Sequence, residues 1–155
     1  MIKPAQPDDL KTLNQLAYES EAYWGHSKTI MSRFCSMYQL TEQDLEENIV
    51  RKFTCRAGNE ITAFFNIKPE GETAQLHHFY VRRDLIGRGL GRKLWKELIA
   101  LCQEKGFQVI EGVTFPKALP FYLKMGAVQT ELYKSRLNPT QLIPKFEFDL
   151  SKLIY

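Results

Sequence analysis

Three glycines alternate with basic and apolar residues in the segment Leu85-Ile86-Gly87-Arg88-Gly89-Leu90-Gly91-Arg92-Lys93. The segment separates a β-rich run from an apolar stripe at helical spacing, so we expect a turn that joins a strand to a helix. Because glycines have no Cβ, successive backbone N–H groups can point into one concavity. The free N–H groups of the first helical turn, together with Arg88 and Arg92, make this concavity positive. The segment therefore predicts a phosphate or diphosphate site.

Two widespread phosphate-binding patterns do not fit this turn. A P-loop requires Lys-Ser or Lys-Thr after its last glycine, and no such pair follows here. A dinucleotide-binding fold requires Gly-x-Gly-x-x-Gly after the first strand of a series of βα units, whereas these glycines lie in the middle of a short chain. A turn that is rich in glycine only because it bends tightly is the alternative to an anion site, and a nucleotide is an alternative ligand.

A second motif follows the glycines. The two patterns are Val81-x-x-x-x-x-Gly87-Arg88-Gly89-Leu90-Gly91 and Ala118-x-x-Phe121-Tyr122-x-x-x-Gly126. In this order they resemble the paired motifs of the GNAT N-acetyltransferase superfamily. The resemblance implies an acetyl-coenzyme A (acetyl-CoA) site with no metal, in which the pantetheine arm lies between two splayed strands and the turn wraps the pyrophosphate. It assigns to cofactor binding Phe79, Tyr80, Val81, Gly87, Arg88, Gly89, Leu90, Gly91 and Arg92.

Two positions depart from the family pattern. Ile86 stands where the family usually starts the turn with Gln or Arg, and Phe115 stands where it commonly has Asn. Both changes remove a polar side chain from the cofactor site and leave the backbone cradle intact. They motivate a second hypothesis, a non-catalytic domain that binds or senses acyl-CoA.

The implied reaction needs a neutral amine, stabilisation of a tetrahedral oxyanion and a proton for the departing thiolate. Tyr122 matches the position from which a tyrosine of the family protonates the sulfur. Its alternative role is to pack with the apolar residues of a short helix. The three cysteines of the chain occupy no motif that calls for an acyl-enzyme, so we expect direct transfer in a ternary complex.

The general base has two candidates. His77 lies on the strand before the turn, where one branch of the family carries a histidine, and Glu111 lies on the following strand. Alternation along a strand places His77 with Phe79 on one face and His78 on the other, so only one histidine is expected to face the cleft. A structural role for His77 and Glu111, and an ordered water in place of a dedicated base, are the open alternatives.

The acceptor pocket is expected near the first two helices. The segment Ala22-Tyr23-Trp24-Gly25-His26-Ser27 resembles one found near the start of a subset of bacterial GNAT proteins of largely unassigned substrate. Tyr23, Trp24 and His26 can offer aromatic faces to an amine, and Glu19 or Glu21 can attract an ammonium group. An aromatic corner between two helices is the structural alternative.

Periodicity predicts the elements that position these residues. Helices are expected from Asp8 or Asp9 through Ala17, from Ser27 through Tyr38, from a capping box at Thr41 and Asp44, from Leu90 to Lys105, and from Ala118 to Met125. Strands are expected at 1–5, 53–57, 61–67, 75–81, 109–114, 128–133 and 145–150, with 69–72 as a turn. The fold class is α+β, a GNAT-like αβα sandwich with a mixed, mostly antiparallel sheet whose parallel strands flank the pyrophosphate-binding helix and splay apart.

Length and composition fit one ordinary domain over residues 1–155, with 44% hydrophobic residues and a net charge of +3. Without a basic stripe, a signal core or a long apolar run, we expect no nucleic-acid or membrane partner and a cytoplasmic protein with reduced thiols. The expected function is transfer of the acetyl group of acetyl-CoA to a primary amine of a small molecule or peptide. The acceptor, the acyl-chain preference and the choice between monomer and homodimer stay open.

Overall fold

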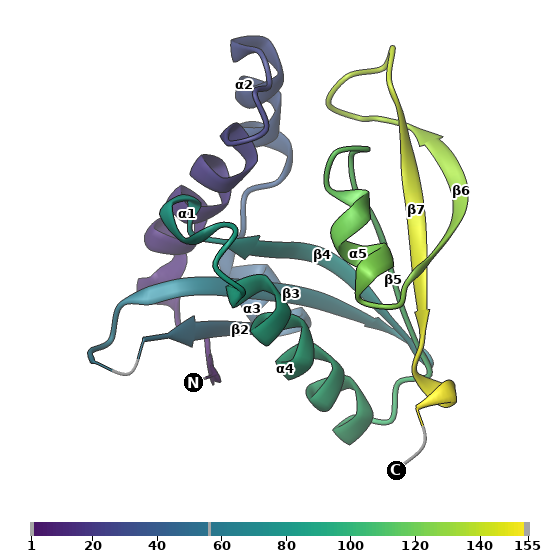
Figure 1. Ribbon diagram of the computed structural model, residues 1–155. Coiled ribbons are helices and arrows are strands. Elements are labelled where there is room, and N and C mark those ends of the chain that lie inside the picture. Colours follow the sequence, from purple (N-terminus) through teal and green to yellow (C-terminus); the bar gives the residue numbers. More distant parts are fainter. Residues whose placement is uncertain (1, 56, 154–155) are drawn as a thin grey trace.

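The computed structural model describes residues 2–55 and 57–153, which contain a seven-stranded mixed sheet in the order β1-β2-β3-β4-β5-β7-β6 (Figure 1). All neighbours in this sheet are antiparallel except β4 and β5, which are parallel. The α+β class and the parallel pair are thus confirmed. The strands are β1 (Ile2–Pro4), β2 (Ile49–Thr54), β3 (Ile61–Glu70), β4 (Thr73–Val81), β5 (Val109–Val113), β6 (Val128–Lys134) and β7 (Leu142–Asp149).

Two helices begin where the sequence predicts, whereas Asp9 stands before α1 without a side-chain cap hydrogen bond and α1 continues past Ala17 to Ala22. Ser27 accepts a hydrogen bond from the Ile30 N–H at the start of α2, and Thr41 and Asp44 form the reciprocal capping box of α3. The helices are α1 (Leu10–Ala22), α2 (Lys28–Met37), α3 (Glu42–Glu47), α4 (Leu90–Glu104) and α5 (Leu119–Lys124), with 3-10 turns at Pro7–Asp9, Arg83–Leu85 and Leu150–Lys152.

Three strands differ most from the prediction. β2 occupies Ile49–Thr54 instead of 53–57, because Val50 is buried beneath α1 and α2 while Lys52 reaches Asp9 with its Nζ, at 2.8 Å. β3 continues through Pro69, where β2 no longer lies alongside and no donor is required. β7 starts at Leu142 rather than 145, because its first residues pair with β6. Met1, in the first predicted strand, and Arg56, in the second, lie outside the described residues.

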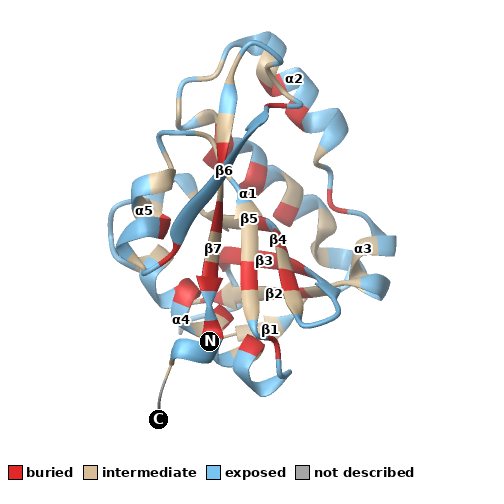
Figure 2. Cartoon of the chain, turned by 90° about the vertical axis from the view of Figure 1, so that its right-hand side faces the viewer, coloured by how far each residue is buried: buried red, intermediate tan, exposed pale blue. Residues whose placement is uncertain are grey.

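Two apolar layers hold the sheet from either side. Phe64 points toward α1 and α2 and is fully buried there, whereas its neighbour Phe65 points to the α4 side and is equally buried. Trp95 from α4 is 1% exposed in the second layer. Figure 2 shows that the buried residues lie along the centre of the sheet, while β6 is exposed along its whole length. The arrangement is the αβα sandwich that the sequence predicts.

The two parallel strands pair only at their beginnings. Three residue pairs join β4 to β5, ending at Gln75 and Glu111, and β4 continues to Val81 without β5 beside it. Figure 1 shows the strands diverging past this point. The predicted splay is therefore present, and it opens the sheet at the end where β4 leads into the glycine turn.

A β-bulge interrupts β4 at His77. Asn66 of β3 pairs with His78 and the next residue, Ile67, pairs with Leu76, so His77 has no partner in the ladder. The extra residue changes which face the following side chains occupy: Leu76 is buried on the α4 side and His78 against the α1–α2 side.

In the described part of the chain, no helix is long and apolar enough to span a membrane.

Candidate functional site

A cavity of about 950 Å³ lies where β4 and β5 diverge. It is bounded by the second half of β4, the end of β5, helices α1 and α2 on one side, and α5 with the β6–β7 connection on the other. Two contacts join these two sides: the Phe115 ring lies 5.3 Å from that of Trp24, and Arg33 donates to the Leu137 carbonyl at 2.8 Å. The cavity is therefore a cleft between the two halves of the sheet.

The glycine turn forms one end of this cavity. Gly87 and Gly89 have φ values of +86° and +84°, which other residues rarely adopt, and nothing lies within 4 Å of a Cβ placed at either position. Gly89 precedes α4 without a side-chain cap, so the first N–H groups of the helix are free for a ligand. At Gly91 a Cβ would lie 3.1 Å from the Phe121 ring, so glycine allows α4 to approach α5 closely.

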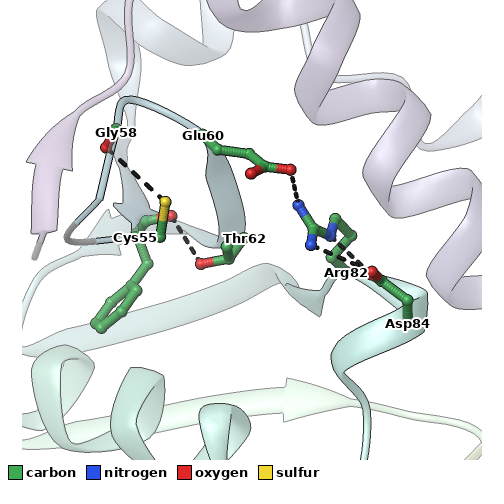
Figure 3. Close-up of polar contacts among 7 residues, drawn as sticks. Cys55, Gly58, Glu60, Thr62, Arg82 and Asp84 are labelled. Atoms are coloured by element: carbon green, nitrogen blue, oxygen red, sulfur yellow. Dashed lines mark hydrogen bonds and ion pairs between the residues drawn. The ribbon is translucent and has the colours of Figure 1, made fainter.

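Arg82 fixes the start of the turn, a role that the sequence did not reveal. Its guanidinium forms a two-pronged pair with Asp84, at 2.7 Å from Nε and 3.2 Å from Nη2, and its Nη1 pairs with Glu60 on the β2–β3 connection (Figure 3). The Arg82 N–H donates to the Thr62 carbonyl at 2.8 Å. The guanidinium lowers the pKa of Asp84. These contacts tie the turn to the neighbouring hairpin, whose Thr62 hydroxyl bonds to the Phe53 carbonyl at 3.2 Å.

Most of the residues predicted to bind the cofactor border the cavity. These are Phe79, Tyr80, Val81, Gly87, Gly89, Gly91 and Arg92. Arg88 is exposed outside it, and Leu90 packs on the core below α4. Ile86 and Phe115, the two apolar departures, also border the cavity. The turn thus offers mainly backbone donors and one arginine.

Tyr122 lies at the centre of an aromatic cluster. Its ring stacks on Phe146 and packs edge-on against Phe79 and Trp95, and the residue is 8% exposed. The hydroxyl makes no hydrogen bond to a described residue. It is not among the fully buried polar atoms that lack a partner. Burial raises the pKa of this phenol, and the charge of Glu21 raises it further. The group therefore keeps its proton over the physiological range.

The two candidate bases occupy different places. His77 borders the cavity, and its pKa is lowered by burial and by Lys68. Glu111 is held by Lys145 at 3.2 Å and by the Gln75 amide at 3.1 Å, and it is not among the residues that line the cavity. The structure therefore brings His77 to the cleft and leaves Glu111 in a surface ion pair.

His78 also borders the cavity, so the expectation that only one histidine faces the cleft is wrong. The bulge at His77 removes the alternation on which that expectation rested. The Nε2 of His78 lies 2.8 Å from the Tyr38 carbonyl and Nδ1 lies 3.1 Å from Asn66 Nδ2. A carbonyl only accepts and an amide nitrogen only donates, so the imidazole is neutral with its proton on Nε2. Burial lowers the pKa of His78 accordingly.

A buried carboxylate also borders the cavity. Glu21 on α1 is 6% exposed; its Oε1 accepts from the Tyr80 hydroxyl at 3.0 Å and its Oε2 lies 3.0 Å from His26 Nε2. Burial raises the pKa of Glu21, against the smaller opposing effect of the His26 and Tyr80 hydrogen bonds. Burial and the adjacent Glu21 raise the pKa of Tyr80 as well.

The predicted acceptor residues separate into two groups. Trp24 and His26 border the cavity, and both rings pack against Phe115, His26 at 4.9 Å. Tyr23 is 45% exposed and does not border it.

Within the described ranges 2–55 and 57–153, no group of three or more metal-ligating side chains could hold a metal ion.

Comparison with known proteins places this geometry among acetyltransferases. Residues 12–127 match the Acetyltransferase (GNAT) family. An uncharacterized N-acetyltransferase of Methanocaldococcus jannaschii is 31% identical over 75 residues, which are 46% of this chain and only 33% of that relative. The chain therefore matches about a third of the length of this curated protein.

Solved structures share the whole fold at low sequence identity. The PaiA N-acetyltransferase of Thermoplasma acidophilum in complex with coenzyme A superposes with a TM-score of 0.77 at 16% identity, covering 96% of this chain and 98% of that one. A GCN5-related N-acetyltransferase of Rhodopseudomonas palustris gives a TM-score of 0.78 at 16% identity, covering 96% and 94%.

Proposed function

Because the chain belongs to the acetyltransferase (GNAT) family, we propose that its cavity holds acetyl-CoA beside a primary amine and that the acetyl group passes directly between them. The observation that carries this proposal is the divergence of β4 and β5 after three residue pairs, with the glycine turn at the open end. An extended arm can lie along the unpaired edge of β4 while a diphosphate meets the free N–H groups of α4. The coenzyme A complex of the Thermoplasma relative supports the same choice of ligand.

Tyr122 supplies the proton in this proposal. The amine nitrogen attacks the thioester carbonyl carbon, the C–S bond breaks as the tetrahedral intermediate collapses, and the thiolate takes the phenolic proton. A phenol that stays protonated until a thiolate forms next to it suits this role, and the hydroxyl has no competing partner among the described residues. The bulge at His77 leaves this residue outside the β3–β4 ladder, where its N–H can stabilise the oxyanion.

Removal of the amine proton is assigned to a group of the cavity. Of the two bases that the sequence suggests, His77 meets this condition, while Glu111 is engaged by Lys145 outside the cavity. His77 is therefore retained as a candidate base, and a role in holding β5 to β7 is proposed for Glu111.

The acceptor is proposed to be the primary amine of a small molecule or of a peptide. One cavity of about 950 Å³ must hold both the pantetheine end of the cofactor and the acceptor, which leaves room for a small group. Trp24 and His26 contribute aromatic walls, whereas Tyr23 does not border the cavity and is half-exposed.

A non-catalytic acyl-CoA-binding domain is the second candidate function. The apolar side chains of Ile86 and Phe115, which border the cavity, favour it, because they offer no polar contact to the ligand. Phe115 is moreover occupied by contacts to Trp24 and His26.

Calorimetry with coenzyme A and with ATP, paired with thiol release from acetyl-CoA over a panel of primary amines, tests both functions. We expect coenzyme A to bind, ATP to bind far more weakly, and at least one amine to release thiol. Binding without release for every amine would favour the acyl-CoA-binding domain. A protein that binds neither ligand would contradict both proposals.

A further inference from the structure

Glu21 is a buried acid with no permanent counter-ion. Among the described residues, His26 is the only basic side chain within ion-pair distance of its carboxylate. An ionised carboxylate that is only 6% exposed is costly unless a cation or several donors satisfy it. This one borders the cavity in which the amine is proposed to bind.

The carboxylate is held in a fixed orientation with acceptor capacity to spare. Tyr80 from β4 bonds to one oxygen and His26 from the α1–α2 connection bonds to the other, both at 3.0 Å. A carboxylate has about four lone-pair sites, so about two remain for further donors. A primary ammonium group, with three N–H donors and one positive charge, matches this remaining capacity.

Glu21 and Tyr122 both border the cavity, Glu21 from α1 and Tyr122 from α5. The negative charge of Glu21 on α1 contributes to the raised pKa of Tyr122 on α5, as it does for Tyr80 and Tyr38. Glu21 is thus an acid of the cavity whose charge acts on the phenol that is proposed to protonate the thiolate.

We propose that Glu21 binds the ammonium form of the acceptor and takes its proton, which makes the protein selective for cationic primary amines. This inference rests on the proposed acetyl transfer. Tyr80 and His26 are positioning residues that fix the two carboxylate oxygens.

The proton balance of the step is closed. One N–H bond of the ammonium breaks as an O–H bond forms on Glu21, and the freed lone pair of the nitrogen forms the new C–N bond. The C–S bond then breaks and the thiolate takes the proton of Tyr122. The nitrogen thus loses two protons, one to Glu21 and one as the new amide forms. One of these two protons restores the phenol of Tyr122, and the other is released to solvent.

The test compares Glu21→Gln with Glu19→Gln, which removes the same charge two residues away on the exposed side of α1. Acceptors are n-butylamine and 2-phenylethylamine, with n-butanol and 2-phenylethanol as neutral isosteres in binding experiments on the coenzyme A complex. For Glu21→Gln we expect kcat/KM for the amines to fall by about 10²-fold, with the Kd of coenzyme A within about twofold of wild type. Glu19→Gln should match wild type, and Glu21→Asp should recover part of the loss.

Several results would overturn the proposal while leaving acetyl transfer intact. These are a Glu21→Gln enzyme as active as wild type, a loss of activity in His77→Gln with none in Glu21→Gln, equal binding of alcohols and amines, or no binding of any cationic amine to the wild-type complex. Failure of the proposed function gives a different pattern, because wild type and all variants would then fail to bind acetyl-CoA.

Discussion

The ring of Tyr122 lies almost flat on that of Phe146, with 4.1 Å between centroids and 15° between planes. The stack joins α5, which follows β5, to β7, which pairs with β5 in the sheet. Packing therefore fixes the ring without using the hydroxyl, and a phenylalanine can occupy the same place. This separation of packing from chemistry makes Tyr122 a clean position for substitution.

Tyr122→Phe is expected to lower kcat by about 10²-fold or more, since positioned general acids contribute this much, while the KM of acetyl-CoA changes little. Steady-state thiol release with a good acceptor checks the rates, and thermal unfolding checks the fold. Tyr133→Phe, at an exposed position on β6, is the matched control and should behave as wild type. Unchanged turnover in Tyr122→Phe would remove Tyr122 from the mechanism.

Gly89→Ala and Gly91→Ala should weaken coenzyme A binding for different reasons. Alanine at Gly89 must adopt φ near +84° in open space, which costs about 1 kcal/mol in stability or shifts the turn. Alanine at Gly91 would approach the Phe121 ring to 3.1 Å and displace it or α4. Calorimetry and chemical denaturation on both variants measure these effects. A Kd equal to that of wild type in both would argue against a ligand at the turn.

His78 should make the protein less stable in mild acid. Its folded-state pKa is lowered by burial, so as the pH falls below 6.5 the unfolded chain takes up a proton that the folded protein does not. The stabilisation present above pH 6.5 is therefore lost as the pH falls through the folded-state pKa. Urea unfolding at pH 7.5 and 5.5 measures this loss, which should be smaller in His78→Gln. Equal losses in the two proteins would contradict a neutral, buried imidazole.

Glu21 should have the opposite dependence. Its folded-state pKa is raised, because burial favours the protonated carboxylic acid. The contribution of this group to the stability of the folded protein is therefore complete below pH 4.5 and is lost as the pH rises through the folded-state pKa. At neutral pH the buried charge of the carboxylate lowers the free energy of unfolding. Glu21→Gln is therefore expected to unfold at a higher temperature than wild type. The difference should vanish near pH 4. A variant that is less stable at pH 7 would contradict this account.

The sequence was sufficient for the helices and for the cofactor motif. Thr41 and Asp44 form the capping box that their spacing predicts, because capping is a local interaction over three residues. The alternating glycines before α4 likewise specify a turn through backbone conformations that each residue carries by itself. The resemblance to the family rests on the same local patterns.

The ends of the strands, and the face of the sheet on which each side chain lies, could be determined only from the tertiary structure. β7 begins at Leu142 because β6 pairs with it, and His77 is pushed out of the ladder because Asn66 faces His78. Neither pairing can be recognised in the sequence of the strand that it affects. Alternation alone therefore assigned the two histidines to opposite faces of the strand, with only one of them facing the cleft. Register is decided between strands.

The contrast is sharpest at Glu21. The sequence by itself determined that an acid stands on the first helix beside an aromatic segment, and that Glu19 and Glu21 were equivalent candidates to attract an ammonium group. Only the tertiary structure separates them, because it exposes Glu19 and buries Glu21 against a tyrosine that is 59 positions away in the chain. The physical reason is that a carboxylate acquires its protonation and its role from the solvent it loses and the donors it meets, and folding settles both.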